Sequence, residues 1–270
     1  MFNITRRIDL MKYYKEIKII KNSGLFDAQW YLRNYPDVKS VGIDPLLHYI
    51  KIGWYEKRNP SNVFFTGSYL KKHPELISKN KCPLLHYLET IVPDQVVSLI
   101  KPFDFNTIYE LGNKKTNDKP YSIYYNSLGK DYVSIDLNGL DGALKLDLCE
   151  AISLPSRDIV FNIGTSEHVV EQEKVFLNIH NLSHHRMVHW VPFEKKHPEH
   201  GMWGYSKEFF IRLASINSYK IEKLYVEESF RNWTLLCCSL KKKHKDKEFV
   251  WRDDLPLFYN EKGSFGVSLQ

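Results

Sequence analysis

Residues 158–169 read DIVFNIGTSEHV, and this stretch decides the fold class. Residues 159–163 are apolar except for one asparagine, which is typical of a buried strand in a parallel sheet. A glycine and two hydroxyl residues follow, and Glu167 and His168 then open a helical pattern. Because a strand that passes through a polar loop into a helix is the repeating unit of α/β folds, the stretch predicts one here.

The same alternation of apolar runs and helical stretches continues on both sides of this segment. It predicts strands at 107–111, 132–136, 144–148, 159–163, 187–191, 221–226 and 233–240, and helices at 121–128, 167–182 and 206–215. Elements in this order predict a Rossmann-like, doubly wound, mostly parallel seven-stranded sheet. In such sheets, ligands bind at the carboxyl ends of the strands.

The first two strand ends carry residues that suit a nucleoside. Glu110 lies in the first strand, which runs into Gly112 and Asn113, where the missing side chain lets the backbone approach a ligand. Asp136 and Leu137 end the second strand. The spacing from Gly112 to Asp136 is close to the usual one of about 20 residues between such a glycine and a ribose-binding carboxylate. A carboxylate suits a diol because it accepts two hydrogen bonds.

The third and fourth strand ends continue the pattern. Asp147 and Leu148 end the third strand, where an acceptor could meet the amine of adenine, and Gly164 and Thr165 follow the fourth. Each of these residues alone also fits an ordinary turn or helix cap. Their joint occurrence, in order along the chain, is what favours a cofactor site.

The segments ELGN (110–113), SIDLNG (134–139), LDL (146–148) and FNIGTSEHV (161–169) together resemble class I S-adenosylmethionine-dependent methyltransferases. The resemblance implies that Gly112 meets the methionine end of the cofactor, Asp136 its ribose and Asp147 with Leu148 its adenine. It also implies that residues 164–168 form the floor of the active site. The chain departs from the family's glycine-rich loop, because Gly112 is followed by NKKT.

Methyl transfer to a hydroxyl needs a base that takes the proton. His168 follows the fourth strand, and His197 and His200 follow the fifth, so the sequence predicts that all three reach the same edge of the sheet. We rank His200 first, because the glycine after it lets the backbone turn. Glu167 is a further catalytic candidate, although it and His168 also suit the first turn of a helix.

Two aromatic residues follow these histidines, and an alternative metal interpretation concerns the histidines themselves. Trp203 and Tyr205 are expected to bind the substrate, since aromatic faces stack on sugar rings. His197, Glu199 and His200 are metal-ligand types, but they lack the helical spacing of known zinc motifs. The sequence therefore predicts no metal.

An internal repeat precedes the sheet. Residues 26–50 align without a gap on residues 64–88, and both copies contain PLLHY. In the first copy Asp44 is an expected helix N-cap, with Pro45 at the first helical position. Each copy is thus expected to form two short helices, and neither could bury its aromatic face alone.

This segment resembles the repeat FDxxYYLxxYPDV…DPLLHYxxxGWxExRNP, which is found beside glycosyltransferases of bacterial surface-polysaccharide assembly. The first copy matches through residues 58–60, whereas the second departs after Tyr87. The resemblance implies a glycan or glycan-precursor substrate and docking to assembly enzymes through the repeats. His48 and His86 fit core packing better than direct glycan contact, and both interpretations stay open.

Composition limits the remaining classes. Apolar residues make up 43% and charged residues 26%, which is ordinary for a globular protein, and no apolar run reaches the length of a transmembrane segment. The four cysteines show no CxxC spacing, so we expect reduced thiols and a cytoplasmic location. The net charge of +6 includes a basic run at 241–245, expected to be solvated, and no nucleic-acid motif accompanies it.

These observations predict an N-terminal helix (1–24), a helical two-copy repeat domain (25–92), the Rossmann-like domain (93–240) and a basic, then aromatic tail (241–270). The expected function is an S-adenosylmethionine-dependent O-methyltransferase acting on a sugar of a surface polysaccharide or its precursor. Methylation of a small molecule or a nitrogen atom stays open. So does a scaffold that keeps the fold without turnover, which the missing glycines favour.

Overall fold

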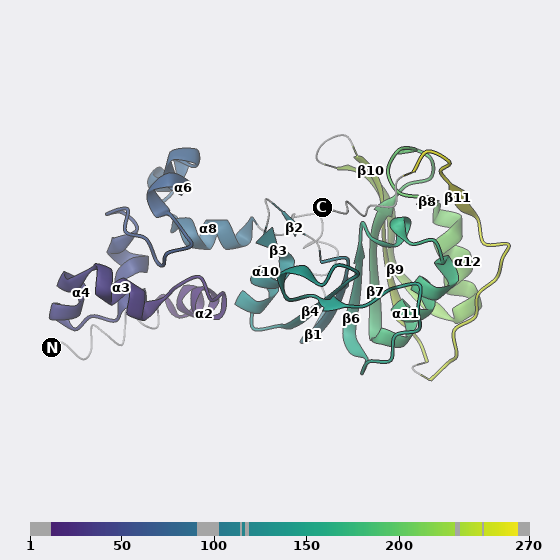
Figure 1. Cartoon of the computed structure of the whole chain (residues 1–270), viewed down its shortest axis with the longest axis horizontal. Helices are drawn as coiled ribbons and strands as arrows, with labels where there is room; N and C mark the ends of the chain where they lie inside the picture. Colours follow the sequence, from purple (N-terminus) through teal and green to yellow (C-terminus); the bar gives the residue numbers. More distant parts are fainter. Residues whose placement is uncertain are drawn as a thin grey trace. The chain divides into compact units, whose positions relative to one another are not determined.

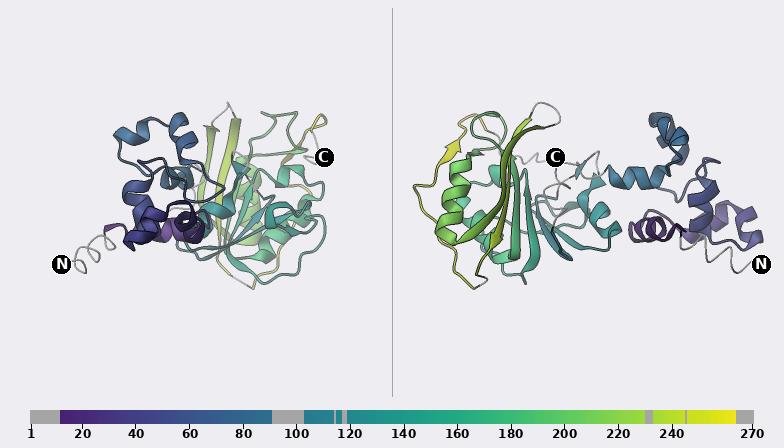
Figure 2. Two further views of the ribbon diagram at one scale, coloured as in Figure 1. Left: turned by 60° about the vertical axis from the view of Figure 1, so that its left-hand side comes forward. Right: turned by 180° about the vertical axis from the view of Figure 1, so that it is seen from behind.

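The computed structural model describes residues 12–90, 103–113, 115–116, 119–229, 233–244 and 246–263. The chain divides into two compact units, one formed by the described residues up to 90 with those of 116–130, the other by the remainder. Figure 1 and Figure 2 show a helical unit and a unit built on a large sheet. In the described part of the chain, no helix is both long and apolar enough to span a membrane.

Short helices build the first unit. They are α2 (Tyr14–Asn22), α3 (Ala28–Asn34), α4 (Pro36–Val41), α5 (Pro45–His48), the π-helical turn η1 (Tyr49–Gly53), α6 (Thr66–Lys72), α7 (Glu75–Ser78), α8 (Pro83–Glu89) and α10 (Tyr121–Ser127). The expected cap is confirmed, because the carboxylate of Asp44 accepts the N–H of Leu47 at 2.9 Å.

Equivalent contacts recur in the two copies of the repeat. The hydroxyl of Tyr31 lies 3.0 Å from Nδ1 of His48, and that of Tyr69 lies 2.9 Å from Nδ1 of His86. Burial lowers the pKa of both histidines. The internal repeat is therefore structural, and each histidine has a packing role within its own copy.

The ending of the first copy folds back onto its beginning. Arg58 donates to the two carboxylate oxygens of Asp37 at 2.9 and 2.8 Å, and its guanidinium lies 4.9 Å from the ring centre of Tyr35. The copies also meet each other, since the buried hydroxyls of Tyr49 and Thr66 are 3.1 Å apart. The arginine of the repeat pattern thus has a structural partner within the same copy.

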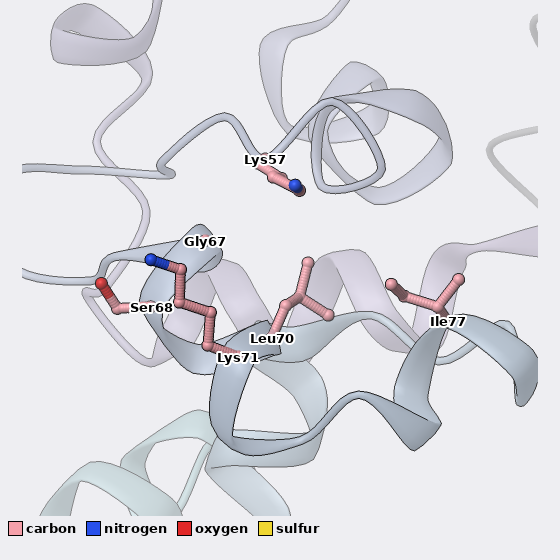
Figure 3. Close-up of a pocket in the computed structure, with 6 residues that line it drawn as sticks. All are labelled: Lys57, Gly67, Ser68, Leu70, Lys71 and Ile77. Carbon is pink, nitrogen blue, oxygen red and sulfur yellow. The ribbon is translucent and has the colours of Figure 1, made fainter.

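A shallow pocket opens in this unit between the end of the first copy and helices α6 and α7. Figure 3 shows Lys57 and Lys71 beside it, with Leu70 and Ile77 forming its apolar side. The residues that the sequence singles out for chemistry lie elsewhere.

The second unit is built on the expected sheet. Its strands are β1 (Thr107–Leu111), β4 (Asp131–Asp136), β5 (Leu144–Lys145), β6 (Arg157–Ile163), β7 (Ser183–Pro192), β9 (Tyr219–Ser229) and β10 (Trp233–Lys242), in the order β5-β4-β1-β6-β7-β10-β9. Parallel pairs join β5 through β7, and β10 is antiparallel to both of its neighbours. The predicted Rossmann-like, mostly parallel seven-stranded sheet is confirmed.

Two helices pack side by side on one face of this sheet (Figure 1). They are α11 (Gln172–Leu182) and α12 (Lys207–Asn217), and the rings of Phe176 and Phe209 meet at 5.2 Å between them. Both rings belong to one core with strand residues such as Leu111 and Leu236. This face needs two apolar helix stripes, which is why the sequence shows helical periodicity in both segments.

The helix expected at 167–182 begins later than predicted. Residues 166–168 form a separate 3₁₀ turn, η3 (Ser166–His168), and α11 starts at Gln172. The physical reason lies in Gln172, whose side-chain amide donates to the carbonyls of Ser166 and Val169 at 2.8 and 2.7 Å. A side chain thus satisfies backbone groups that a continuous helix would have bonded internally.

Smaller elements complete this unit. The 3₁₀ turn η2 (Leu140–Gly142) follows β4. Where the chain passes from β1 to α10, and so from the second unit to the first, β2 (Lys115–Thr116) pairs with β3 (Lys119–Pro120). Strands β8 (Trp203–Tyr205) and β11 (Leu257–Tyr259) form an antiparallel pair. Because Trp251 and Leu255 also pack into the core, part of the C-terminal segment belongs to this domain.

Candidate functional site

The parallel strands direct five loops to one edge of the sheet. These loops follow β1, β4, β5, β6 and β7, and the strand order reverses between β1 and β6. Ligands of doubly wound sheets bind at such a reversal. The sequence-predicted residues follow these same strands, so the topology brings their loops to one edge.

Asp136 ends β4 and shapes the loop that follows. One of its carboxylate oxygens accepts the N–H of Asn138 at 2.9 Å, and the side chain of Asn138 accepts the N–H of Leu140 at 2.8 Å. These two consecutive turns fix the loop, and the bond to Asn138 uses only one of the two carboxylate oxygens of Asp136. Leu137 lies beside it and is exposed.

Asp147 and Leu148 stand on the loop after β5. Asp147 is exposed and accepts the N–H of Cys149 at 2.8 Å, whereas Leu148 is buried. Asn178 of α11 holds this loop from below, because its amide donates to the carbonyls of Leu148 and Glu150 at 3.0 and 2.8 Å. Its oxygen accepts from the backbone further along the same loop.

Gly112 and Thr165 join the two loops beside the reversal. Thr165 Oγ1 donates to the carbonyl of Leu111 at 2.6 Å. A Cβ at residue 112 would lie 2.2 Å from Oγ1 of Thr165. Gly112 also has a φ of +90°, which side-chain-bearing residues rarely adopt. The absence of a side chain at Gly112 thus permits this close contact with Thr165. Gly164, the residue before Thr165, also has a positive φ, of +63°.

The other two candidates on β1 and its loop are buried. Glu110 lies within β1 and accepts a hydrogen bond from Ser134 at 3.2 Å. Asn113 donates to the carbonyl of Leu140 at 2.9 Å, while its side-chain oxygen is buried without a partner among the described residues. Asn113 therefore ties the loop after β1 to the loop after β4.

Glu167, His168 and His200 form what we call the Glu167 cluster. The Glu167 side chain is 1% exposed, and Nε2 of His200 and of His168 lie 3.6 and 4.0 Å from its Oε1. The two imidazole rings meet nearly at right angles, 4.7 Å apart. Loops after two adjacent strands thus bring one carboxylate and two imidazoles together, as the sequence predicted only in outline.

Backbone contacts hold the two halves of this cluster in place. The N–H of Met202 donates to the carbonyl of Glu167 at 2.7 Å. Gly201 has a φ of +69°, and a Cβ at this position would lie 2.8 Å from Cγ of Glu167. Asn260, which is itself buried, also supports this segment, because its side-chain amide and backbone N–H donate to the carbonyls of Gly201 and Met202.

His197 is positioned differently from His200. Its Nε2 accepts the backbone N–H of Thr234 at 2.8 Å, and its ring packs 4.2 Å from that of Trp233. Burial lowers the pKa of His197, and the charge of His200 lowers it further. A neutral ring whose accepting nitrogen is already bonded serves to anchor the loop to β10.

The two aromatic candidates also differ from each other. Tyr205 is fully buried, with its hydroxyl 2.8 Å from both Ser166 Oγ and Gln172 Oε1, so it supports η3 from within and offers no ring face to a substrate. Trp203 is partly exposed and packs against Tyr259 at 5.2 Å. Only Trp203 retains a surface that an acceptor could reach.

Sequence reasoning missed the buried polar residues that support the site. Asn162 bonds Ser166 through both its amide and its oxygen, and Asn178 holds the loop of Asp147. A signal exists, since both asparagines occupy core-facing positions of apolar elements, where a polar side chain must find a partner. Trp233 and Asn260 carry no comparable signal.

No protein-family model matches the chain, and no curated protein matches it. Among solved structures it is similar to a 1,6-didemethyltoxoflavin-N1-methyltransferase of Burkholderia thailandensis with bound S-adenosylhomocysteine, at 11% identity and a TM-score of 0.46, covering 66% of this chain and 85% of that one. It is also similar to magnesium protoporphyrin IX methyltransferase of Synechocystis PCC 6803 with bound SAM, at 12% identity and a TM-score of 0.42, covering 76% of this chain and 97% of that one.

A SAM-dependent methyltransferase of Aquifex aeolicus shows 16% identity and a TM-score of 0.38, with 57% of this chain and 91% of that one covered.

Proposed function

We propose that this chain is an S-adenosylmethionine-dependent methyltransferase that O-methylates a sugar of a bacterial surface polysaccharide or its precursor. One observation carries the proposal. Loops on one side of the strand reversal present Asp136 and Asp147, and loops on the other side present a buried carboxylate with two imidazoles. Acceptors for a nucleoside and groups that handle a proton thus lie on either side of one ligand-binding edge.

The cofactor would lie across the loops after β1, β4 and β5. Asp136 would accept the ribose hydroxyls, because its turn-forming bond occupies one oxygen and a carboxylate offers several lone pairs. Asp147 would accept from the adenine amine, beside Leu148. Gly112 and Asn113 would face the methionine end.

The reaction would take place beside the Glu167 cluster. Bound S-adenosylmethionine would supply the methyl group, which the acceptor oxygen would take as the C–S bond breaks and its electron pair returns to sulfur, leaving S-adenosylhomocysteine. The hydroxyl proton leaves at the cluster, where His200 is the most exposed imidazole, at 40%. Glu167, buried beside both rings, would stabilise the positive charge that such a step creates.

The acceptor class rests on the repeat and on Trp203. The sequence of the first unit resembles a repeat pattern found beside enzymes of surface-polysaccharide assembly, and the partly exposed Trp203 follows the loop that carries His200. We place the protein in the cytoplasm, because all four cysteines are free thiols. Its repeats would dock on enzymes of the same assembly.

Calorimetric titration with S-adenosylmethionine tests the proposal. Wild-type protein should bind, and Asp136→Asn, which keeps an acceptor for the N–H of Asn138, should lose affinity by about 10-fold or more, the loss of one charge-assisted bond. Asp136→Ala should lose at least as much. Asp131→Asn, which changes an exposed aspartate at the opposite end of β4, is the matched control.

No saturable binding by the wild-type protein at millimolar cofactor would overturn the proposal. It would leave the scaffold interpretation in its place. If Asp136→Asn binds like wild type while Asp136→Ala is merely less stable, Asp136 is a turn cap only.

A further inference from the structure

The carboxylate of Glu167 is buried in an unusual way. The side chain is 1% exposed, and neither of its oxygens has a hydrogen-bond partner among the described residues. Nearly all buried polar atoms in native proteins are hydrogen-bonded, and a buried atom without such a partner costs free energy. A cation bound at these oxygens would supply the partner that they lack.

Two imidazole nitrogens face the same oxygen. The distances of 3.6 and 4.0 Å from Oε1 to Nε2 of His200 and of His168 exceed those of hydrogen bonds. They approach the separation of about 3.0–3.5 Å that two donors adopt when each lies about 2.1 Å from a shared ion. One ligand atom from each of the three residues fits within 4.8 Å of the others.

We infer that Glu167, His168 and His200 bind a divalent first-row transition-metal ion. Two imidazoles with one carboxylate suit Mn²⁺, Fe²⁺, Co²⁺ or Zn²⁺, whereas Mg²⁺ and Ca²⁺ prefer oxygen ligands alone. Three protein ligands leave open positions, as in catalytic sites rather than closed structural ones. This trio differs from the His197, Glu199 and His200 set that sequence spacing argued against.

The backbone is arranged to form this site. Met202 bonds the carbonyl of Glu167 at 2.7 Å, so the loop that carries His200 is held against η3. The absence of a side chain at Gly201 leaves room for that of Glu167, because a Cβ there would lie 2.8 Å from its Cγ. The backbone thus brings the carboxylate and the imidazole together whatever reaction takes place beside them.

The metal site would also refine the proposed function, although the metal site does not require that function to be correct. If the chain methylates a hydroxyl, an open position on the ion would take the acceptor oxygen and lower the pKa of its proton. His200 would then hold the ion, and the cluster would keep its part in deprotonation.

A second trio in the helical unit supplies the matched control. His73, Glu75 and His86 also bring three ligand atoms together, but Glu75 is 44% exposed and Nδ1 of His86 is bonded to Tyr69. Neither carboxylate oxygen there is buried and unpartnered. The variant Glu75→Gln thus removes an exposed carboxylate that also lies beside two histidines of the same chain.

The experiment is a calorimetric titration of the chelator-treated full chain with Mn²⁺ and with Zn²⁺, without S-adenosylmethionine. We expect one saturable site, at least 10-fold weaker in Glu167→Gln and in His200→Ala, and unchanged in Glu75→Gln. The ion should raise the thermal midpoint of the wild type, since it binds the folded state, and leave that of Glu167→Gln unchanged. A Co²⁺ complex should show ligand-field bands without thiolate charge transfer.

Wild-type protein that binds neither ion would overturn the inference, as would Glu167→Gln that binds like wild type. Loss of the ion in Glu75→Gln would assign it to the helical unit and overturn the inference equally. Because none of these measurements uses the cofactor, a chain that binds metal but not S-adenosylmethionine refutes only the proposed function. The reverse result refutes only the metal site.

Discussion

His197 and His200 stand on one loop but meet different partners. Nε2 of His197 accepts the N–H of Thr234, whereas Nε2 of His200 faces Glu167. Glutamine at 197 can still accept that N–H, so His197→Gln should keep turnover within a few-fold of wild type. His200→Gln should lose about 10²- to 10⁴-fold, with cofactor affinity intact. Transfer of labelled methyl groups to a panel of sugars and glycan precursors would measure both.

The outcome bears directly on how the cluster works. Equal losses in the two variants would mean that the loop as a whole, rather than the imidazole of His200, supports catalysis. Full activity in His200→Gln and also in His168→Gln would exclude both histidines from proton removal.

Two other histidines should make stability depend on pH. Burial lowers the pKa of His180 to about 4 and that of His189 to about 3, against about 6.5 in an unfolded chain. Below pH 6.5 these histidines are therefore protonated in the unfolded state but stay neutral in the folded state, and the free energy of unfolding falls. At pH 5.5 each histidine should cost about 1 kcal/mol relative to pH 7.5.

Urea unfolding at pH 7.5, 6.5 and 5.5 measures this effect. His180→Gln is expected to be less stable at every pH, because it alters the bonds to Tyr219 and the carbonyl of Lys247. Its free energy of unfolding should nevertheless change less between the three pH values. A wild-type free energy that is constant from pH 7.5 to 5.5 would contradict the buried, neutral state of both rings.

Gly201 allows the loop after β7 to pack closely against Glu167. Gly201→Ala should destabilise the protein by more than the about 1–2 kcal/mol that a side chain costs at positive φ, because its Cβ would also press on Glu167. Gly42→Ala is the control, since Gly42 has nearly the same φ, +68°, with no atom within 4 Å of the added carbon. Denaturant unfolding of the two variants isolates the contact with Glu167.

Equal destabilisation of the two glycine variants would show that the contact with Glu167 relaxes at no cost. In that case the loop is less rigid than its hydrogen bond from Met202 to Glu167 indicates. Ion affinity, measured on the same samples, should fall in Gly201→Ala only.

Elements were predictable from the sequence where local pattern determines them. The strand expected at 107–111 has those bounds, and the helices at 121–128 and 206–215 are each shifted by a residue or two at their ends. The strand expected at 144–148 ends at Lys145, because Asp147 turns the chain by accepting the N–H of Cys149. Side-chain bonds to the backbone thus explain where pattern and structure diverge.

The candidate site was predictable only as a set of strand ends. Sequence order places His168 and His200 after adjacent strands, but their approach to Glu167 depends on a bond between two loops and on positive φ at Gly201. Neither feature has a local signature. The anchoring of His197 and the burial of Tyr205 are likewise tertiary effects, since each depends on a partner far along the chain.

At the scale of the whole molecule, the two units do not follow the order of the chain. Helix α10 lies between β1 and β4 in sequence, yet it groups with the N-terminal helices, through contacts with α2 and α8. A boundary drawn near residue 93 therefore separates α10 from the helices it packs against. Local periodicity could not reveal this, because it reports which face of a helix is apolar and not what covers that face.

Removal of the N-terminal helices should expose the apolar face of α10. A fragment of residues 93–270 keeps α10 but loses α2 and α8, so the rings of Tyr121 and Tyr125, each 1% exposed in the full chain, should become more accessible. The fragment should unfold at a lower temperature than the full chain and should self-associate, as exposed apolar faces do. Calorimetry and sedimentation would show both, and Tyr121→Ser with Tyr125→Ser should reduce the association without restoring stability. A monomeric fragment with an unchanged thermal midpoint would mean that the sheet domain holds α10 by itself, and the helical unit would then contribute nothing to its stability.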